Sequence, residues 1–290
     1  MNGTKRMNIL ITGAHGQLGN EMRRLSVCYP GYTFFFTDVQ ELDICDREAV
    51  GQYMEAHDIL LVVNCAAYTA VDRAEEDEKL CDRINHLAPG YLAEAAERVG
   101  ASLIHVSTDY VFDGTAHIPY TEDCPTCPAS VYGTTKLAGE QAIRRNCKKA
   151  AILRTSWLYS TFGNNFVKTM IRLGRERDAL GVIFDQIGTP TYAADLAQVI
   201  YVMIEKGVVP GIYHFSNEGV CSWYDFTKAI HRLAGITSCR VSPLHTADYP
   251  TLAARPHYSV LDKTHIKKTY AIEIPYWEDS LAACIHALES

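Results

Sequence analysis

The chain has 290 residues, of which 48% are hydrophobic and 21% charged, values typical of a globular protein with a substantial core. Its formal net charge of −7 argues against a nucleic-acid partner, because nucleic-acid-binding domains are usually basic. The longest apolar run, residues 59–67, is too short to cross a bilayer, and residues 1–6 lack the apolar core of a secretory signal. We therefore expect a cytoplasmic protein that binds no nucleic acid and no membrane.

Strand-like apolar runs alternate with helical patterns through the first half of the chain. The expected strands cover residues 7–12, 32–37, 59–64, 102–107 and 151–157. The expected helices cover residues 17–25, 46–57, 78–99 and 132–145. Pro89 is expected to kink or split the helix over 78–99. Such alternation predicts right-handed crossovers, so the fold class is α/β, a Rossmann-type doubly wound parallel sheet.

The second half is less regular and predicts a smaller C-terminal lobe that binds the substrate. Its expected helices cover residues 165–177, 193–205 and 222–233, and its expected strands cover residues 181–184 and 211–216. Ser222 is expected to cap the helix over 222–233. We divide the chain into a cofactor-binding domain, 1–157, to which residues 186–206 return, and a mainly substrate-binding lobe, 158–290.

The ten cysteines are scattered and form no disulfide framework, so reduced thiols are expected. Cys124 and Cys127 form a single CxxC pair in a proline-rich loop. A zinc site would need a second ligand pair at matching spacing, and none follows. No metal site is predicted.

A glycine-rich turn follows the first expected strand. Gly13, Gly16 and Gly19 give a GxxGxxG pattern that opens a helix, a context that favours binding of a dinucleotide pyrophosphate. Asp38 ends the second strand, where a partner for the ribose hydroxyls is expected. Its carboxylate would repel the 2′-phosphate of NADPH, and residues 39–41 add no Lys or Arg. These residues favour NADH.

Tyr132 and Lys136 are four positions apart on an expected helix and therefore share a face. An ammonium group near a phenol lowers the phenol pKa from its usual value of about 10 toward neutrality. Thr108 lies at the end of an expected strand, where ligands bind in open parallel sheets, and its hydroxyl could hold a substrate carbonyl. The alternative for Thr108 is a strand-end cap, and for Tyr132 and Lys136 a surface pair.

Together these motifs resemble the dTDP-4-dehydrorhamnose reductases, a family of extended short-chain dehydrogenases/reductases. The resemblance rests on residues 13–19, 62–72, 107–112, 132–140, 154–157, 163–166 and 254–256. It implies hydride transfer from NADPH or NADH to the C4 ketone of dTDP-4-dehydro-L-rhamnose, the last step of dTDP-L-rhamnose synthesis. By this resemblance Tyr132 donates the proton, Lys136 lowers the tyrosine pKa and holds the nicotinamide ribose, and Thr108 adjusts that pKa.

The resemblance also implies binding residues. The cofactor residues are Gly13, Gly16, Gln17, Leu18, Gly19, Asp38, Asp43, Ile44, Ala67, Tyr68, Thr69, Tyr132 and Lys136. The residues expected at the nucleotide sugar are Thr108, Asp109, Trp157, Asn164 and Arg255, where the arginine can offer a planar fork of donors to phosphate. Family members use either cofactor, which leaves the choice open. Some bind magnesium at a dimer contact, but no residue here can be assigned to that ion, and a homodimer stays open.

Several less specific interpretations remain. Trp157 could belong to the core, Asp43 could cap a helix, and Arg255 could be an ordinary surface arginine. Asn85, in the middle of an expected helix, is expected to be exposed. The rival functions are a nucleotide-sugar epimerase or 4,6-dehydratase, and a non-catalytic regulatory subunit that resembles the methionine adenosyltransferase β subunit. Dehydratases that resemble this fold carry a glutamate where this chain has Tyr110.

Overall fold

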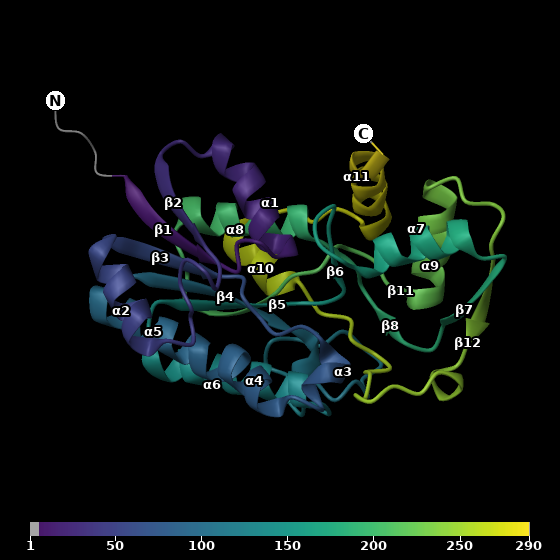
Figure 1. Ribbon diagram of the computed structural model, residues 1–290, viewed down its shortest axis with the longest axis horizontal. Helices are drawn as coiled ribbons and strands as arrows, with labels where there is room; N and C mark the ends of the chain where they lie inside the picture. The colour runs from purple at the N-terminus through teal and green to yellow at the C-terminus, as the bar shows by residue number, and fades with distance from the viewer. Residues whose placement is uncertain (1–5, 290) are drawn as a thin grey trace.

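A parallel sheet of six strands forms the larger part of the computed structural model, which describes residues 6–289 (Figure 1). Its strands are β1 (Met7–Thr12), β2 (Tyr32–Thr37), β3 (Ile59–Asn64), β4 (Ser102–Thr108), β5 (Ala150–Thr155) and β10 (Gly211–His214). They lie in the order β10-β5-β4-β3-β1-β2, and all neighbouring pairs are parallel. The predicted Rossmann-type doubly wound sheet is confirmed. The expectation of no secretory signal falls largely on residues 1–5, which lie outside the described residues.

Helices cover both faces of this sheet (Figure 1). One face carries α1 (Gln17–Leu25), α8 (Ala193–Lys206) and α10 (Thr264–Tyr270), and the other carries α2 (Arg47–Ala56), α5 (Ala88–Val99) and α6 (Val131–Asn146). Met22 and Ile200 are fully buried on the first face, and Met54, Leu92 and Ile143 on the second. Burying each of these side chains contributes roughly 1.5–3 kcal/mol. Two apolar layers therefore hold the strands in place.

Strand order places a ligand crevice at one edge of the sheet. β1 lies between β2 and β3, so the chain leaves β1 in one direction and later returns on its other side. The crevice outside the carboxyl ends of the strands at such a reversal is the usual ligand site of open α/β sheets. The glycine-rich turn follows the carboxyl end of β1.

The helix expected over residues 78–99 is interrupted by a π-helical segment. It consists of α4 (Glu78–Asp82), the π-helix Arg83–Leu87 and α5, and Pro89 stands in the first turn of α5. Proline has no N–H for the preceding turn, and a locally wider helical turn accommodates that loss. Gly100 ends the helix in the left-handed conformation, with φ +74°. The helix expected to kink or split at Pro89 is instead interrupted by this π-helical turn, which ends at Leu87.

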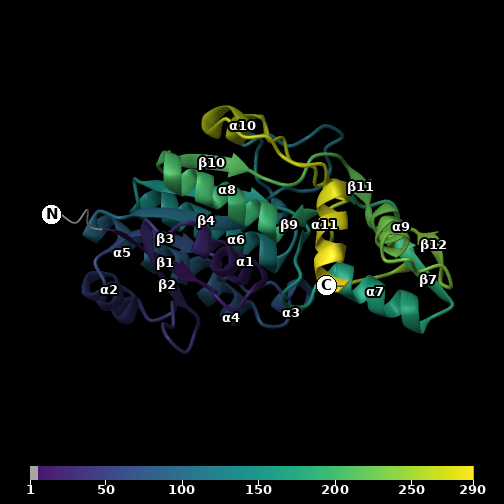
Figure 2. The same cartoon turned by 90° about the horizontal axis from the view of Figure 1, so that it is seen from above.

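The smaller lobe lies beyond the carboxyl ends of the strands (Figure 2). It contains α7 (Phe166–Glu176), β7 (Ala179–Ile183), α9 (Trp223–Leu233), β12 (Arg240–Leu244) and α11 (Trp277–Glu289). Phe226, Trp277 and Leu281 belong to its separate apolar core. Ser222 caps α9 as predicted, because its hydroxyl accepts the Asp225 N–H at 3.1 Å.

Short strand pairs and returning segments connect the two parts. β6 (Leu158–Tyr159) pairs with β9 (Thr191–Tyr192), and β8 (Ile187–Gly188) pairs with β11 (Cys221–Ser222). Besides α8, which lies within the predicted return over 186–206, β10 and α10 also belong to the sheet domain. The chain therefore crosses between the two parts several times.

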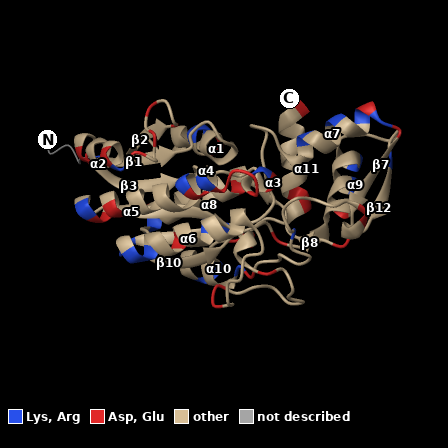
Figure 3. Ribbon diagram, turned by 60° about the horizontal axis from the view of Figure 1, so that its bottom comes forward, with Lys and Arg blue, Asp and Glu red and all other residues tan. Residues whose placement is uncertain are grey.

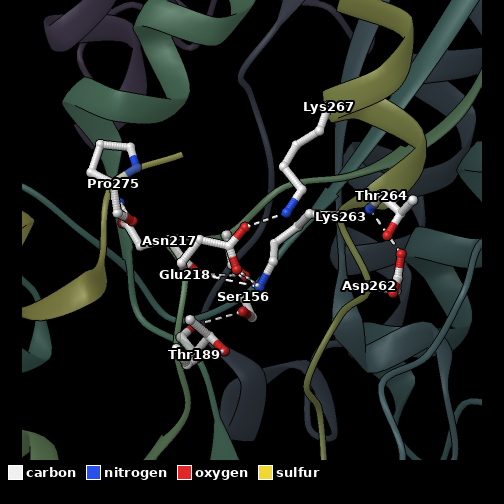
Figure 4. A network of polar contacts seen from close by, with 11 residues as sticks. Ser156, Thr189, Asn217, Glu218, Asp262, Lys263, Thr264, Lys267 and Pro275 are labelled. Carbon is white, nitrogen blue, oxygen red and sulfur yellow. Dashed lines mark hydrogen bonds and ion pairs between the residues drawn. The ribbon is translucent and has the colours of Figure 1, made fainter. Parts of the chain in front are cut away.

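Polar contacts hold the segments that follow β5 and β10, where the chain passes between the two parts (Figure 4). Glu218, shortly after β10, accepts a hydrogen bond from Lys267 at 2.7 Å and lies 3.5 Å from the Lys263 ammonium. Ser156, directly after β5, donates to the carbonyl oxygen of Thr189 at 2.7 Å. These contacts tie the ends of β5 and β10 to the segments that enter the lobe.

Lys or Arg and Asp or Glu residues are mixed along the outer helices α2, α5 and α6 (Figure 3). Within residues 6–289, no helix combines the length and apolar character needed to cross a membrane.

Candidate active site

The turn between β1 and α1 lets a ligand approach the backbone closely. Gly13 has φ +65°, and a Cβ on it would lie 2.7 Å from the backbone of Ala66. A Cβ on Gly19 would collide with the carbonyl oxygen of Gly13. Gly16 caps α1 without a side-chain hydrogen bond from any described residue, so the first helical N–H groups remain available to an anion. This turn fits a dinucleotide pyrophosphate.

A pocket of about 360 Å³ continues from this turn past the carboxyl ends of β1, β2 and β3. Six of the predicted cofactor residues line it, namely Gly13, Gly16, Asp38, Asp43, Ile44 and Ala67. Asp38 accepts the His15 N–H at 3.0 Å, and the His15 ring lies 3.7 Å from the same carboxylate oxygen. Asp43 does not cap α2, because Asp46 accepts the first N–H groups of that helix. The structure therefore removes the capping interpretation of Asp43.

The other predicted cofactor residues lie around this pocket. The side chain of Leu18 is buried against the sheet, so only its backbone is at the turn. The Gln17 side-chain oxygen accepts a hydrogen bond from Asn165 at 3.0 Å. Tyr68 is half-buried and Thr69 is exposed in the loop after β3.

Asn85 is fully buried, and the expectation that it is exposed was wrong. Its Oδ1 accepts the Tyr68 N–H at 2.9 Å, and its Nδ2 donates to the Tyr68 carbonyl at 3.0 Å. One amide thus holds both backbone groups of a residue beside the cofactor pocket. Regular helical periodicity could not identify it, because Asn85 lies in the π-helix, which changes the face that each residue presents.

Arg83, also in the π-helix, lines the same pocket as Asp38. It is a cation that inspection of residues 39–41 could not find, because it lies far along the chain and reaches the pocket through the fold. The sequence argument for NADH considered the Asp38 carboxylate of this pocket but not the Arg83 guanidinium that lines it too.

The predicted catalytic residues meet at the carboxyl end of β4. Tyr132 lies in the first turn of α6, with Ser130 as the cap, and Thr108 is the last residue of β4. The Tyr132 side chain is largely buried, and its ring packs edge-on against Tyr110 with centroids 5.4 Å apart. Burial raises the pKa of Tyr132, and a hydrogen bond with Thr108 opposes that rise. The phenol is therefore held in its protonated, proton-donating form.

Lys136 lies one turn further along α6 and is 1% exposed. Its Nζ donates to the Val106 carbonyl at 2.7 Å and lies 3.3 Å from Nε2 of His105. Burial lowers the pKa of Lys136 to about 8. The lysine is therefore able to change its charge near neutral pH.

Asp109 follows Thr108 and is buried beside this pair. Its Oδ1 accepts the Thr108 hydroxyl at 3.0 Å, while Oδ2 lacks a hydrogen-bond partner among the described residues. Burial raises the pKa of Asp109 to about 6. An unpaired buried oxygen of this kind is costly unless a ligand supplies a donor.

A second pocket, of about 660 Å³, lies between the sheet domain and the lobe. Its lining includes Asp72, Tyr110, Trp157, Trp223 and Arg255. Because Tyr110 also packs on Tyr132, this pocket lies next to the predicted catalytic residues. Its apolar and aromatic walls with a few polar groups are typical of a small-molecule site.

Three of the predicted substrate residues occupy different positions relative to this pocket. Trp157 has φ +48° and stacks on Trp223, with ring centroids 3.5 Å apart, so it forms a pocket wall. Arg255 is half-buried and forms an ion pair of 2.6 Å with Asp72. Asn164 is exposed and is not part of this lining. Trp223 was missed because a tryptophan at the start of a helix resembles an ordinary core residue.

Within residues 6–289, no group of three or more His, Cys, Asp or Glu side chains is arranged to hold a metal ion. All ten cysteines are free, and Cys124 is near the hydroxyl of Thr121.

The fold and the paired sites define a class of protein with a Rossmann-type dinucleotide site and a Tyr–Lys pair, the arrangement of extended short-chain dehydrogenases/reductases. Solved enzymes with the same fold include a dTDP-glucose 4,6-dehydratase from Bacillus anthracis in complex with NAD, with a TM-score of 0.81 and 18% identity over 98% of this chain and 96% of that one. At this level of identity the likeness concerns the fold alone.

The family follows from closer matches. A sequence model described as RmlD substrate binding domain matches residues 7–290, and the chain belongs to this family. A dTDP-4-dehydrorhamnose reductase from Aggregatibacter actinomycetemcomitans is 43% identical over 283 residues, covering 94% of this chain and 96% of the relative. A dTDP-4-dehydrorhamnose reductase from Bacillus anthracis, solved in complex with NADP, has a TM-score of 0.94 and 39% identity over 97% and 99% of the two chains. The resemblance predicted from the sequence motifs is confirmed.

Proposed function

We propose that this chain reduces the C4 ketone of dTDP-4-dehydro-L-rhamnose to dTDP-L-rhamnose with NADPH or NADH, the last step of dTDP-rhamnose synthesis. The observation that carries the proposal is the position of Tyr132, whose buried phenol meets Thr108 and whose ring packs on Tyr110, a residue that lines the pocket beside the lobe. The names of the family's relatives, and the NADP bound to one of them, support the substrate and the cofactor.

The dinucleotide, when bound, supplies the hydride. The glycine turn would bind its pyrophosphate, and Asp38 with Arg83 would contact the adenosine end. Thr108 would orient the substrate carbonyl while the Tyr132 phenol donates its proton to the carbonyl oxygen. Lys136 would hold the nicotinamide ribose and limit the cost of the phenolate that forms.

In this proposal the sheet domain binds the cofactor and the lobe binds the nucleotide sugar. Trp157, Asp109 and Arg255 would contact that substrate, and the stacked Trp157–Trp223 pair would form an apolar wall against it. Asn164 stays a proposed substrate residue that would need to approach on binding. A cytoplasmic location and a homodimer complete the proposal.

The rival functions receive less support. Tyr110 occupies the position of the dehydratase glutamate, and burial raises its pKa to about 12, so it cannot act as a carboxylate base. A regulatory subunit would not need Thr108, Tyr132 and Lys136 together in one buried site.

The test is oxidation of NADPH and NADH by the purified protein with a panel of nucleotide-linked 4-keto sugars. We expect turnover with dTDP-4-dehydro-L-rhamnose, and release of the cofactor during purification. A cofactor that stays bound through turnover would favour the epimerase, and absence of turnover by the protein alone would favour the regulatory subunit.

The Tyr132→Phe variant tests the assignment of the proton donor. It should bind the cofactor as the wild type does but lose activity by roughly a hundredfold or more, because general acid catalysis contributes that much. Cofactor titration and steady-state kinetics measure both effects, and near wild-type turnover would contradict the assignment.

A further inference from the structure

A buried row of polar side chains runs behind the catalytic pair, from β1 through β3 and β4 to α6. Thr12 donates to Oδ1 of Asn64 at 2.7 Å, and Nδ2 of Asn64 lies 3.0 Å from Nδ1 of His105. Nε2 of His105 lies 3.3 Å from Nζ of Lys136. All four residues are at most 1% exposed, so bulk water does not reach their hydrogen bonds. The direction of each bond must come from the row itself.

Asn64 sets that direction. Its Oδ1 also accepts the backbone N–H of Ala66, at 3.1 Å. A backbone N–H can only donate, so the amide cannot be reversed without setting two donors against each other. The Nδ2 of Asn64 is therefore a donor, and Nδ1 of His105 must accept from it.

The tautomer of His105 follows from this constraint. Burial and the neighbouring Lys136 charge hold the pKa of His105 well below its usual value, so the ring is neutral. A neutral ring whose Nδ1 accepts carries its proton on Nε2. That N–H points at the lysine nitrogen.

Building on the proposed function, we propose that His105 is a positioning residue for Lys136, and that its Nε2–H, fixed by Asn64, favours the amine form of the lysine over the ammonium form. The amine can accept the His105 N–H, whereas the ammonium presents its own hydrogens to it. The ammonium in turn has the Val106 carbonyl as an acceptor. Each form of the lysine thus has a hydrogen-bond partner, so the buried site can hold Lys136 in either protonation state.

Other ionisable groups also face the lysine. Glu140 on α6 and Cys81 on α4 both act to raise the pKa of Lys136, and burial outweighs them. His105 is the group on β4 that faces Nζ. Its contribution can therefore be separated by substitutions in the row that leave α4 and α6 unchanged.

The first experiment reads the tautomer directly. In wild-type protein labelled with ¹⁵N-histidine, two-bond ¹H–¹⁵N correlation spectra should show one ring that is unprotonated at Nδ1 and protonated at Nε2 across neutral pH. The His105→Phe spectrum assigns that ring. A proton on Nδ1, or a doubly protonated ring, would overturn the proposal, and this reading does not depend on catalysis.

The second experiment reverses the direction of the hydrogen bonds at His105. In Asn64→Asp the carboxylate still accepts from Thr12 and Ala66 but now also accepts from Nδ1–H of His105, which leaves Nε2 free to accept from the ammonium. The alkaline decline in kcat/KM should move upward by about one pH unit. Asn8→Asp is the control, because it adds a carboxylate at the amino end of β1, away from Thr12. It should not move the alkaline decline in kcat/KM.

A double-mutant cycle separates transmission through His105 from a through-space effect of the new charge. In a His105→Phe background, the Asn64→Asp substitution should leave the alkaline decline in place. If the same upward shift persists without the imidazole, His105 does not transmit it and the proposal is wrong. Thermal unfolding of each variant checks that it is folded. Failure of the proposed function would appear separately, as undiminished activity in Tyr132→Phe.

Discussion

Asp109 and Lys136 are ionisable residues held inside the protein, and burial moves their pKa values in opposite directions. The pKa of Asp109 rises to about 6 and that of Lys136 falls to about 8. Burial disfavours whichever form is charged, so an acid and a base both shift toward neutrality. Proton transfer near neutral pH requires groups with such values, and buried sites that supply them are often functional.

Keeping the Asp109 carboxylate ionised in the interior costs free energy, so we predict that Asp109→Asn stabilises the fold. Because the folded state binds the Asp109 proton more tightly than the unfolded state, stability falls as the pH rises from the ordinary aspartate value through about 6. The substitution should therefore add about 2 kcal/mol to the free energy of unfolding near pH 8, and much less near pH 4. Urea denaturation at both values measures it, and an equal gain at both would refute the explanation.

Cofactor preference is a second property of single residues. Asp38→Ala should raise the ratio of kcat/KM for NADPH to that for NADH by roughly tenfold, about 1.4 kcal/mol, because a repelling carboxylate is removed. Arg83→Ala should lower the same ratio, since Arg83 is a cation of that pocket. Arg47→Ala, an exposed arginine on α2, is the control. Unchanged ratios in both pocket variants would show that neither side chain contacts the ribose end.

The π-helix Arg83–Leu87 contributes two residues to the lining of the pocket beside the glycine turn. It contributes Arg83 to the lining of this pocket and places Asn85 against Tyr68 in the loop after β3. Wide helical turns of this kind are rare and often occur at functional sites. Here the wide turn precedes Pro89, which removes one N–H from the regular helical pattern.

Because Asn85 of this π-helix holds the Tyr68 backbone, we predict that Asn85→Ala weakens both the fold and cofactor binding. The substitution leaves the N–H and carbonyl of Tyr68 without their amide partner, and each lost bond should cost roughly 1–3 kcal/mol if no water replaces it. The free energy of unfolding should fall and the Kd for the cofactor should rise, as measured by denaturation and fluorescence titration. Gln52→Ala, on the exposed face of α2, serves as the control. A loss of stability without any change in Kd would restrict Asn85 to a structural role.

At the scale of the whole molecule, polar contacts join the sheet domain to the lobe at two places. Ser160 donates to the buried carboxylate of Glu21 at 2.7 Å, and Asp72 pairs with Arg255 across the inter-lobe pocket. Contacts that depend on a few directional bonds can be broken and remade, which is what closure over a substrate requires.

Arg255→Lys tests how this junction recognises the substrate. A guanidinium can bond Asp72 and still offer other N–H groups to phosphate oxygens, whereas a lysine has no planar fork. The KM for the nucleotide sugar should rise about tenfold or more while the Kd for the cofactor stays constant. If both constants rise together, Arg255 supports the lobe and does not read the substrate; if neither changes, it is not a phosphate ligand.

The sequence by itself determined most elements of the sheet domain, the fold class and the family, but not β12, α10 or α11 near the C-terminus. Those properties depend on local patterns: apolar runs with the period of strands or helices, glycines required by a tight turn, and a Tyr–Lys pair on one helical face. The Ser222 cap is likewise local, because its cause lies within one helical turn.

Only the tertiary structure decided which distant residues share a site. Arg83 joins Asp38, Asn85 holds Tyr68, Trp223 stacks on Trp157, and His105 meets both Asn64 and Lys136. Hydrogen bonds, ring contacts and burial depend on which strands are neighbours and on the helical register, and these result from packing the whole chain. For the same reason the pKa values of Asp109 and Lys136, which burial sets, follow from the fold and not from the residue types.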